Sequence, residues 1–94
     1  MGSMDIKTIK RGERVLKGGA NKNRLRILDF IATENFTSVW AISQGLKLEI
    51  SNTSQHLLRL EKAGLISKQQ SGLTVYHDLT PYGKKLLEFI KHLK

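Results

Sequence analysis

The chain has 94 residues, of which 39% are hydrophobic, so it is long enough for one domain with one modest core. It contains no cysteine, which excludes disulfides and thiolate metal sites. Sixteen Lys and Arg against eight Asp and Glu give a formal charge of +8. Such a charge indicates a polyanionic partner, either nucleic acid or an acidic membrane surface, unless it serves solubility alone.

No apolar run approaches the roughly 18–20 residues of a membrane span, and no apolar signal-peptide core follows the N-terminus. A cytoplasmic location without membrane association is therefore expected. Residues 1–4, Met-Gly-Ser-Met, are interpreted as a cloning remnant or a disordered start, and residues 5–94 as one domain. Residues 1–26 hold eight of the sixteen Lys and Arg but only two of the eight acidic residues, so this segment is electrostatically distinct.

Three helices are predicted in the first half of the chain. Residues 6–16 place Ile6, Ile9 and Leu16 on one helical stripe, which two glycines at 18–19 end. A second helix over 24–33 follows N-cap residue types at 21–23, and residues 35–37 form a connector with a possible strand stub. Ser38 is the expected N-cap of a third helix, which Gly45 ends; Trp40 on it is expected at the core edge or in a dimer contact.

The next helix is predicted over residues 50–63, after a tight turn at 47–49, and Gly64 stops it. Its helical period gives two opposite stripes. The inward stripe consists of Ile50, Thr53 or Ser54, Leu57 and Leu60, and the outward stripe of Ser51, Asn52, Gln55, Arg59 and Lys62.

A β-hairpin and a final helix complete the pattern. Strands are expected over 65–70 and 73–79, joined by a tight turn at Ser71-Gly72. Thr80 as N-cap and Pro81 at the first helical position begin a helix that runs to residue 92 or 93. Its apolar face is broader than a domain of this size needs, so part of it is expected to meet a partner chain.

This order of elements predicts an α+β fold of the winged helix-turn-helix type. Two helices joined by a short turn form the helix-turn-helix, and the hairpin forms the wing. The major groove of B-DNA admits one helix, so helix 50–63 is expected there and the wing at 66–79 on the backbone or in the minor groove. The candidate DNA contacts are Ser51, Asn52, Gln55, His56 and Arg59 in the helix, and Lys68, Gln69, Gln70, Ser71 and Gly72 in the wing.

Three segments also resemble a known family. Residues 54–66, SQHLLRLEKAGLI, are similar to the recognition-helix signature of the arsenic-repressor-like and multiple-antibiotic-resistance-like winged-helix regulators. Residues 23–31 resemble the first core helix of the arsenic-repressor-like group. Residues 79–87 resemble the start of the last helix in many winged-helix proteins, notably archaeal ones. The resemblance implies a homodimer, built from the N- and C-terminal helices, that binds a nearly palindromic operator in double-stranded DNA.

Other kinds of site are not expected. His56, His77 and His92 lie in three different elements without a second ligand at helical spacing, so neither a metal site nor a cofactor is expected. No nucleophile–base pair, carboxylate pair or phosphate loop points to an enzyme. Glu49 stands where the family often has Ser or Thr, and its carboxylate faces DNA phosphate unfavourably. The alternative function is a winged-helix module that coats DNA without sequence preference or binds protein.

Overall fold

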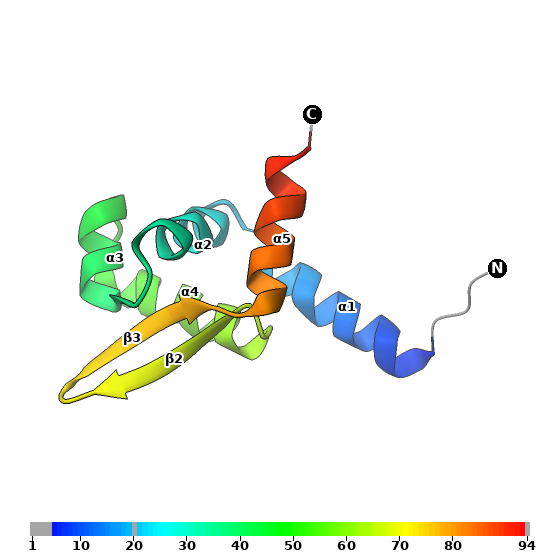
Figure 1. The fold of residues 1–94 in the computed structure, drawn as a ribbon, viewed down its shortest axis with the longest axis horizontal. Coiled ribbons are helices and arrows are strands. Elements are labelled where there is room, and N and C mark those ends of the chain that lie inside the picture. The colour runs from blue at the N-terminus through cyan, green and yellow to red at the C-terminus, as the bar shows by residue number, and fades with distance from the viewer. Residues whose placement is uncertain (1–4, 20, 94) are drawn as a thin grey trace.

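A computed structural model describes residues 5–19 and 21–93; the segment 1–4, interpreted above as a remnant or disordered start, lies outside the described residues. Figure 1 shows the arrangement, in which α1 projects at one end of the molecule and a β-hairpin at the other, while α5 rises between them. In chain order the elements are α1 (Ile6–Gly19), α2 (Lys22–Glu34), β1 (Thr37–Ser38), α3 (Val39–Leu46), α4 (Ile50–Lys62), β2 (Ile66–Ser71), β3 (Thr74–Leu79) and α5 (Pro81–Lys91). This is the predicted winged helix-turn-helix, with the three strands in the antiparallel order β1-β3-β2.

The core lies where α2, α3 and α4 meet the base of the hairpin and α5. Every one of these elements contributes aliphatic side chains, and burying each contributes about 1.5–3 kcal/mol. Its most buried members are Ile27, Leu28, Ile31, Ile42, Leu60 and Leu65. α1 joins this core through Val15, which is partly buried against it, while its other apolar side chains stay exposed.

Side-chain caps begin α2, α3 and α5, as the residue types predict, and Asp5 Oδ1 caps α1 by accepting from the Thr8 N–H at 2.8 Å. The Asn21 carboxamide oxygen accepts hydrogen bonds from the backbone N–H groups of Asn23 and Arg24 at 2.9 and 3.2 Å. Ser38 Oγ accepts from the Ala41 N–H at 3.1 Å, and Thr80 Oγ1 accepts from the Gly83 N–H at the same distance. These bonds satisfy N–H groups that lack a partner inside the helix, so they define where α2, α3 and α5 start.

Two helix ends differ from the prediction. The first helix ends at the predicted glycine pair but is longer than residues 6–16, because α1 includes both glycines and ends at Gly19. Gly45 does not end α3: the helix continues to Leu46, and Lys47 at φ 57° provides the left-handed C-cap. Gly45 instead makes room for the ring of Phe30, which a Cβ at this position would overlap. A close approach between helices, rather than a helix stop, therefore explains this glycine.

The hairpin turn is shifted by one residue from its predicted position. Ser71 pairs with Thr74, so the two turn residues are Gly72, at φ 63°, and the fully exposed Leu73. The expected strand stub exists as β1, where Thr37 pairs with His77. His77 is buried, and its Nδ1 donates to the Thr37 carbonyl oxygen at 3.2 Å.

The inward stripe of α4 also needs one correction. Ile50 was expected inside, but 48% of its surface is exposed. Thr53 is fully buried instead, and its hydroxyl donates to the Glu49 carbonyl oxygen at 2.9 Å. Of the two residues left open for this position, Thr53 faces the core and Ser54 is exposed.

The packing of α5 on the backbone gives a test of this fold. A Cβ added at Gly83 would overlap the Leu65 carbonyl oxygen, which is backbone and cannot swing away. We expect Gly83→Ala to lower the free energy of unfolding by about 1–3 kcal/mol, the usual cost of overpacking. Gly12→Ala is the matched control, because Gly12 is helical, exposed and has open space around its Cα.

The control substitution should stabilise the protein slightly, by up to about 1 kcal/mol, since alanine has the higher helix propensity. Urea unfolding followed by circular dichroism measures both variants. Equal effects of the two substitutions would contradict the close contact between α5 and Leu65.

Candidate nucleic-acid interface

The helix-turn-helix consists of α3 and α4, joined by the predicted three-residue turn at 47–49. The turn is held by a backbone hydrogen bond from the Leu48 N–H to the Ser43 carbonyl oxygen at 2.9 Å. The inner side of α4 is buried and consists of Thr53, Leu57 and Leu60. Since these positions occupy one side of the helix, the opposite side faces solvent.

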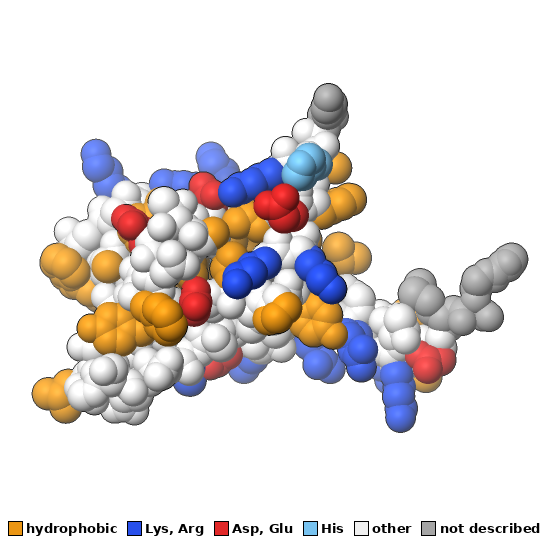
Figure 2. All heavy atoms as spheres, viewed as in Figure 1, with side chains coloured by type: hydrophobic (Ala, Val, Ile, Leu, Met, Phe, Trp, Pro, Cys, Tyr) orange, Lys and Arg blue, Asp and Glu red, His pale blue; other side chains and the backbone are white. Residues whose placement is uncertain are grey.

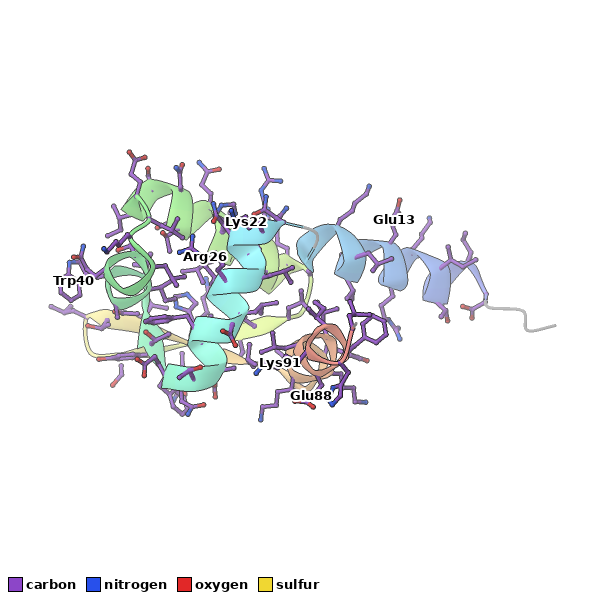
Figure 3. The ribbon with its side chains drawn as sticks, turned by 90° about the horizontal axis from the view of Figure 1, so that it is seen from above. Glu13, Lys22, Arg26, Trp40, Glu88 and Lys91 are labelled. Carbon is purple, nitrogen blue, oxygen red and sulfur yellow. The ribbon has the colours of Figure 1, made fainter. Side chains whose placement is uncertain are left out.

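The predicted contact residues of α4 lie on this outer side. Ser51, Asn52, Gln55 and Arg59 are exposed, and His56 is half-buried at its edge. Four of them, Asn52, Gln55, His56 and Arg59, line one open hollow together with Asn21 and Arg24 of α2. In Figure 3 the N-terminal end of α2, marked by Lys22, meets both α4 and α1.

Glu49 precedes the first residue of α4. It stands at the N-cap but makes no capping hydrogen bond through its side chain. Its carboxylate instead accepts a hydrogen bond from the hydroxyl of Ser51 at 3.0 Å. Ser51 therefore directs its one donor to Glu49 in the free protein.

His56 has an unusual environment for a surface histidine. Its Nδ1 atom is buried and has no hydrogen-bond partner among the described residues. Desolvation by burial lowers the pKa of His56, and the positive charges of Arg24 and Arg59 lower it further. The ring therefore favours its neutral form beside two guanidinium groups.

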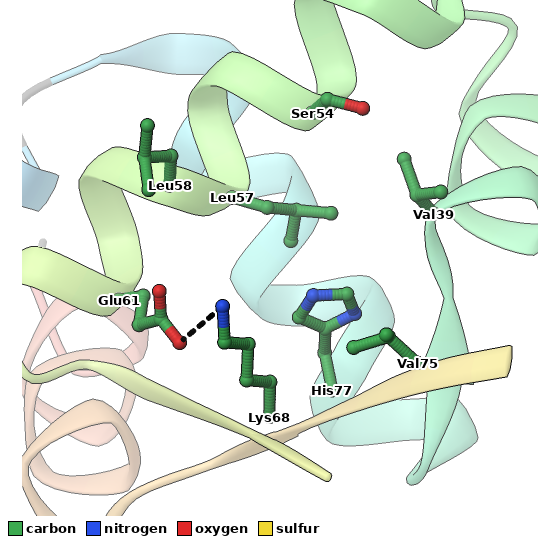
Figure 4. Close-up of a pocket in the computed structure, with 8 residues that line it drawn as sticks. All are labelled: Val39, Ser54, Leu57, Leu58, Glu61, Lys68, Val75 and His77. Carbon is green, nitrogen blue, oxygen red and sulfur yellow. Dashed lines mark ion pairs between the residues drawn. The ribbon is translucent and has the colours of Figure 1, made fainter. Parts of the chain in front are cut away.

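The wing residues divide into two groups. Gln69, Gln70, Ser71 and Gly72 are exposed towards the tip, where the Gln70 amide donates to the Gly72 carbonyl oxygen at 3.3 Å. Lys68 instead turns back towards α4 and forms an ion pair with Glu61 at 3.5 Å (Figure 4). The hairpin strands from residue 69 to residue 76 contain no charged side chain, so the tip offers amides, a hydroxyl and an exposed Leu73.

Sequence reasoning missed the residues around the end of α4. Arg14 and Lys17 of α1, Arg24 of α2, and Arg59 and Lys62 of α4 line a second open hollow, with Ala63 at its edge. Lys62 was assigned to the outward stripe but not to the contact set, and the basic charge of α1 was noted without a location. The structure places both beside Arg59 and so extends the positive surface from α4 onto α1.

Two other kinds of feature are absent from residues 5–19 and 21–93. No helix in these residues is long and apolar enough to cross a membrane. Within the same residues, no three His, Cys, Asp or Glu side chains come together as a metal-binding group.

The comparisons with known proteins agree with this geometry. Residues 21–68, about half of the chain, match the family model described as "Bacterial regulatory protein, arsR family". The transcriptional activator HlyU of Vibrio cholerae is 35% identical over 78 residues, which cover 83% of this chain and 71% of HlyU.

Solved structures similar to this chain are also those of transcriptional regulators. A homodimeric winged helix-turn-helix DNA-binding domain from Mycobacterium bovis, a possible ArsR-family regulator, has a TM-score of 0.79 at 25% identity and covers 100% of this chain and 94% of its own. The transcriptional repressor PagR of Bacillus anthracis has a TM-score of 0.82 at 25% identity, covering 92% and 99%. These relatives are bacterial, so the likeness of the last helix to archaeal proteins gains no support from them.

HlyU and PagR are transcriptional regulators rather than enzymes, and the overall fold of this chain is that of PagR and of the winged helix-turn-helix domain from Mycobacterium bovis. The chain therefore belongs to the arsR family of bacterial regulatory proteins and is a winged helix-turn-helix, DNA-binding transcriptional regulator.

Proposed function

We propose that this chain works as a homodimer that binds a specific, nearly palindromic site in double-stranded DNA. α4 enters the major groove, and the wing formed by β2 and β3 lies on the backbone or in the minor groove. The observation that carries the proposal is the outer side of α4, which presents polar side chains next to the positive hollows described above. A regulator of this kind acts where the chromosome is, in the cytoplasm of a bacterium.

The side chains on α4 suit base reading in different ways. Asn52 and Gln55 carry amides, which pair with the N6 and N7 edge of adenine, while the Arg59 guanidinium fits the O6 and N7 edge of guanine. Leu58 was not predicted as a contact, but 49% of it is exposed, on the side of α4 that faces the wing. An apolar group there suits the methyl group of thymine.

The wing has a supporting role in this proposal. Its tip, formed by Gln69, Gln70, Ser71 and Gly72, approaches the sugar-phosphate backbone or minor groove with neutral donors and acceptors. Lys68 is the cation in the wing nearest to the tip, and its ion pair with Glu61 draws it towards α4. We therefore assign to the wing the positioning of the domain on DNA rather than most of its electrostatic affinity.

Dimerisation is proposed from the unburied apolar residues at the end opposite to the wing. Ile6 and Leu16 of α1 are 63% and 67% exposed, and Phe89 of α5 is 65% exposed. Figure 2 shows hydrophobic side chains standing out from α5 on the side above α1. A two-fold axis at this end would place two α4 helices for successive major grooves, about 34 Å apart. The dimeric state named for the Mycobacterium bovis domain supports this assignment.

Base reading by α4 gives the first test of the proposed function. After selection of a preferred site from random DNA, we expect Gln55→Ala and Arg59→Ala each to weaken binding there by about 1–3 kcal/mol and to relax the base preference. The control is Arg26→Ala, because Arg26 bonds to the Leu46 carbonyl oxygen at 3.0 Å, away from the outer side of α4.

Fluorescence anisotropy with the selected and random sites measures these effects. Parent-like binding by both α4 variants would exclude this helix as the reader. Failure of the selection to enrich any sequence would favour the alternative, a protein that coats DNA without sequence preference.

The dimer gives the second test. Sedimentation should report about twice the chain mass of 10.6 kDa. We expect Phe89→Glu to shift the protein to the monomer, because it places a charge in the apolar contact. Trp40→Glu is the matched control, since Trp40 is 62% exposed but lies at the other end of the molecule, far from α1 and α5 (Figure 3).

The control variant should remain dimeric. This placement of Trp40 also argues against the dimer contact that the sequence left open for it. A monomeric parent protein at micromolar concentration, or dissociation by both substitutions alike, would contradict the proposed interface.

A further inference from the structure

Arg24 combines deep burial with the lack of a partner for its charge. It lies in the first turn of α2, and only 9% of its surface is exposed. Its Nε atom is buried and has no hydrogen-bond partner, and none of the ion pairs within residues 5–19 and 21–93 involves it. Its terminal nitrogens are not among the buried unpartnered atoms, and Arg24 lines two open hollows. Burying part of a cation without a hydrogen-bond partner or a counter-charge is costly, so the retention of Arg24 calls for a partner from outside the chain.

No acidic residue is among the described residues that line the two hollows beside Arg24. Arg24 lies between the two hollows described above and lines both of them. Besides Arg24, the hollow between α2 and α4 is lined by Asn21, Asn52, Gln55, His56 and Arg59. The hollow next to α1 is lined by Arg14, Lys17, Arg59 and Lys62. Lys17 has its own ion pair with Glu13 at 3.4 Å, on the exposed side of α1. The charges that converge on Arg24 are therefore positive.

A second side chain at the same place also lacks a partner. The buried Nδ1 of His56 comes from α4, whereas Arg24 comes from α2, and both residues line the hollow of about 290 Å³ between these helices. Two unsatisfied polar groups from separate helices thus meet at one open hollow. An oxyanion there would accept hydrogen bonds from the guanidinium and from a neutral imidazole that carries its proton on Nδ1.

We propose that the hollow between α2 and α4 binds a phosphate group of the DNA backbone, with Arg24 as its main ligand and His56 and Arg59 beside it. The inference rests on the proposed function, because it concerns the same face of α4. The hollow shares Asn52 and Gln55 with the base-reading surface. A helix in a groove about 12 Å wide has phosphates along both flanks, so a phosphate beside α4 is within reach of this hollow.

A phosphate bound in this hollow would fix the position of α4 along the major groove. Arg24 belongs to α2, and the two hollows that it lines are also lined by residues of α4 and, in one of them, of α1. The phosphate ligand would therefore be held by contacts with three helices. A guanidinium presents two parallel N–H groups in a plane and suits phosphate oxygens better than an ammonium does. Contacts of this kind position a protein on DNA without reading its sequence.

The main test replaces Arg24→Met, which keeps an unbranched stem and removes the charge. Arg26→Met is the matched control, two residues further along α2, where the guanidinium bonds to the Leu46 carbonyl and the Asn23 carboxamide oxygen. Binding to the selected and to random DNA is measured over four salt concentrations. We expect Arg24→Met to weaken both by a similar factor of about ten and to reduce the slope of log K against log salt by about one unit.

Thermal unfolding gives a readout that separates this role from a structural one. Since Arg24 is buried without a partner, Arg24→Met should melt at the same temperature as the parent or higher. Arg26→Met should melt slightly lower and keep the parent salt slope. If Arg24→Met instead melts lower and keeps the parent slope, Arg24 is a packing residue and the proposal is wrong.

Two further experiments do not depend on the folding of that variant. Arg24→Lys keeps the charge, so it should retain the parent slope while weakening both DNAs. On the parent protein, neutral methylphosphonates placed one at a time along the selected site should reveal one sensitive phosphate in each half-site. For Arg24→Met, a methylphosphonate at that position should no longer weaken DNA binding. If neutralising each phosphate in turn weakens binding by a similar amount, then no single phosphate occupies the hollow and the proposal is wrong.

The source of the phosphate is tested with inorganic phosphate at constant ionic strength. Stabilisation of the parent but not of Arg24→Met, combined with an unchanged salt slope on DNA, would assign the hollow to a free anion and overturn the assignment to the backbone. Failure of the parent protein to bind any DNA would instead contradict the proposed function itself, so the two failures are distinguishable.

Discussion

The burial of one side of α4 is the constraint on which the rest of the structure depends. Thr53, Leu57 and Leu60 pack into the core, and their spacing leaves the opposite side in solvent. α3, the turn at 47–49 and the base of the hairpin all contact the buried side, so they hold α4 without covering its outer face. The rigidity of that face comes from the core beneath it, which is what a reader of base edges requires.

The main elements could be predicted from the sequence because they depend on local chemistry. Asn21, Ser38 and Thr80 cap helices with their own side chains, and such caps are readable from residue type. The exposed face of α4 followed from helical period alone. The family signature added the register, since it covers the end of α4 and the glycine after it.

What the sequence could not show depends on contacts between distant elements. Gly45 and Gly83 look like helix-ending or flexible positions, but their reason is the approach of Phe30 and of the Leu65 backbone. The sequence assigned no place in the core to His77, which is buried where β3 pairs with β1. Lys68 looked like a free wing cation until Glu61 on α4 was placed beside it. In each case the partner lies more than five residues away.

Positive charge on this protein is divided between groups that have partners and groups that do not. Lys17, Lys68 and Lys91 form exposed ion pairs, and such pairs add little to stability. Among the described residues Arg24 has no such partner, although it is more buried than these lysines. A charge kept without compensation in the free protein costs folding energy but needs no rearrangement when a phosphate arrives. The domain would thereby have a lower free energy of unfolding but a preorganised contact for phosphate. The dimer interface at α1 and α5 would raise the free energy of unfolding again.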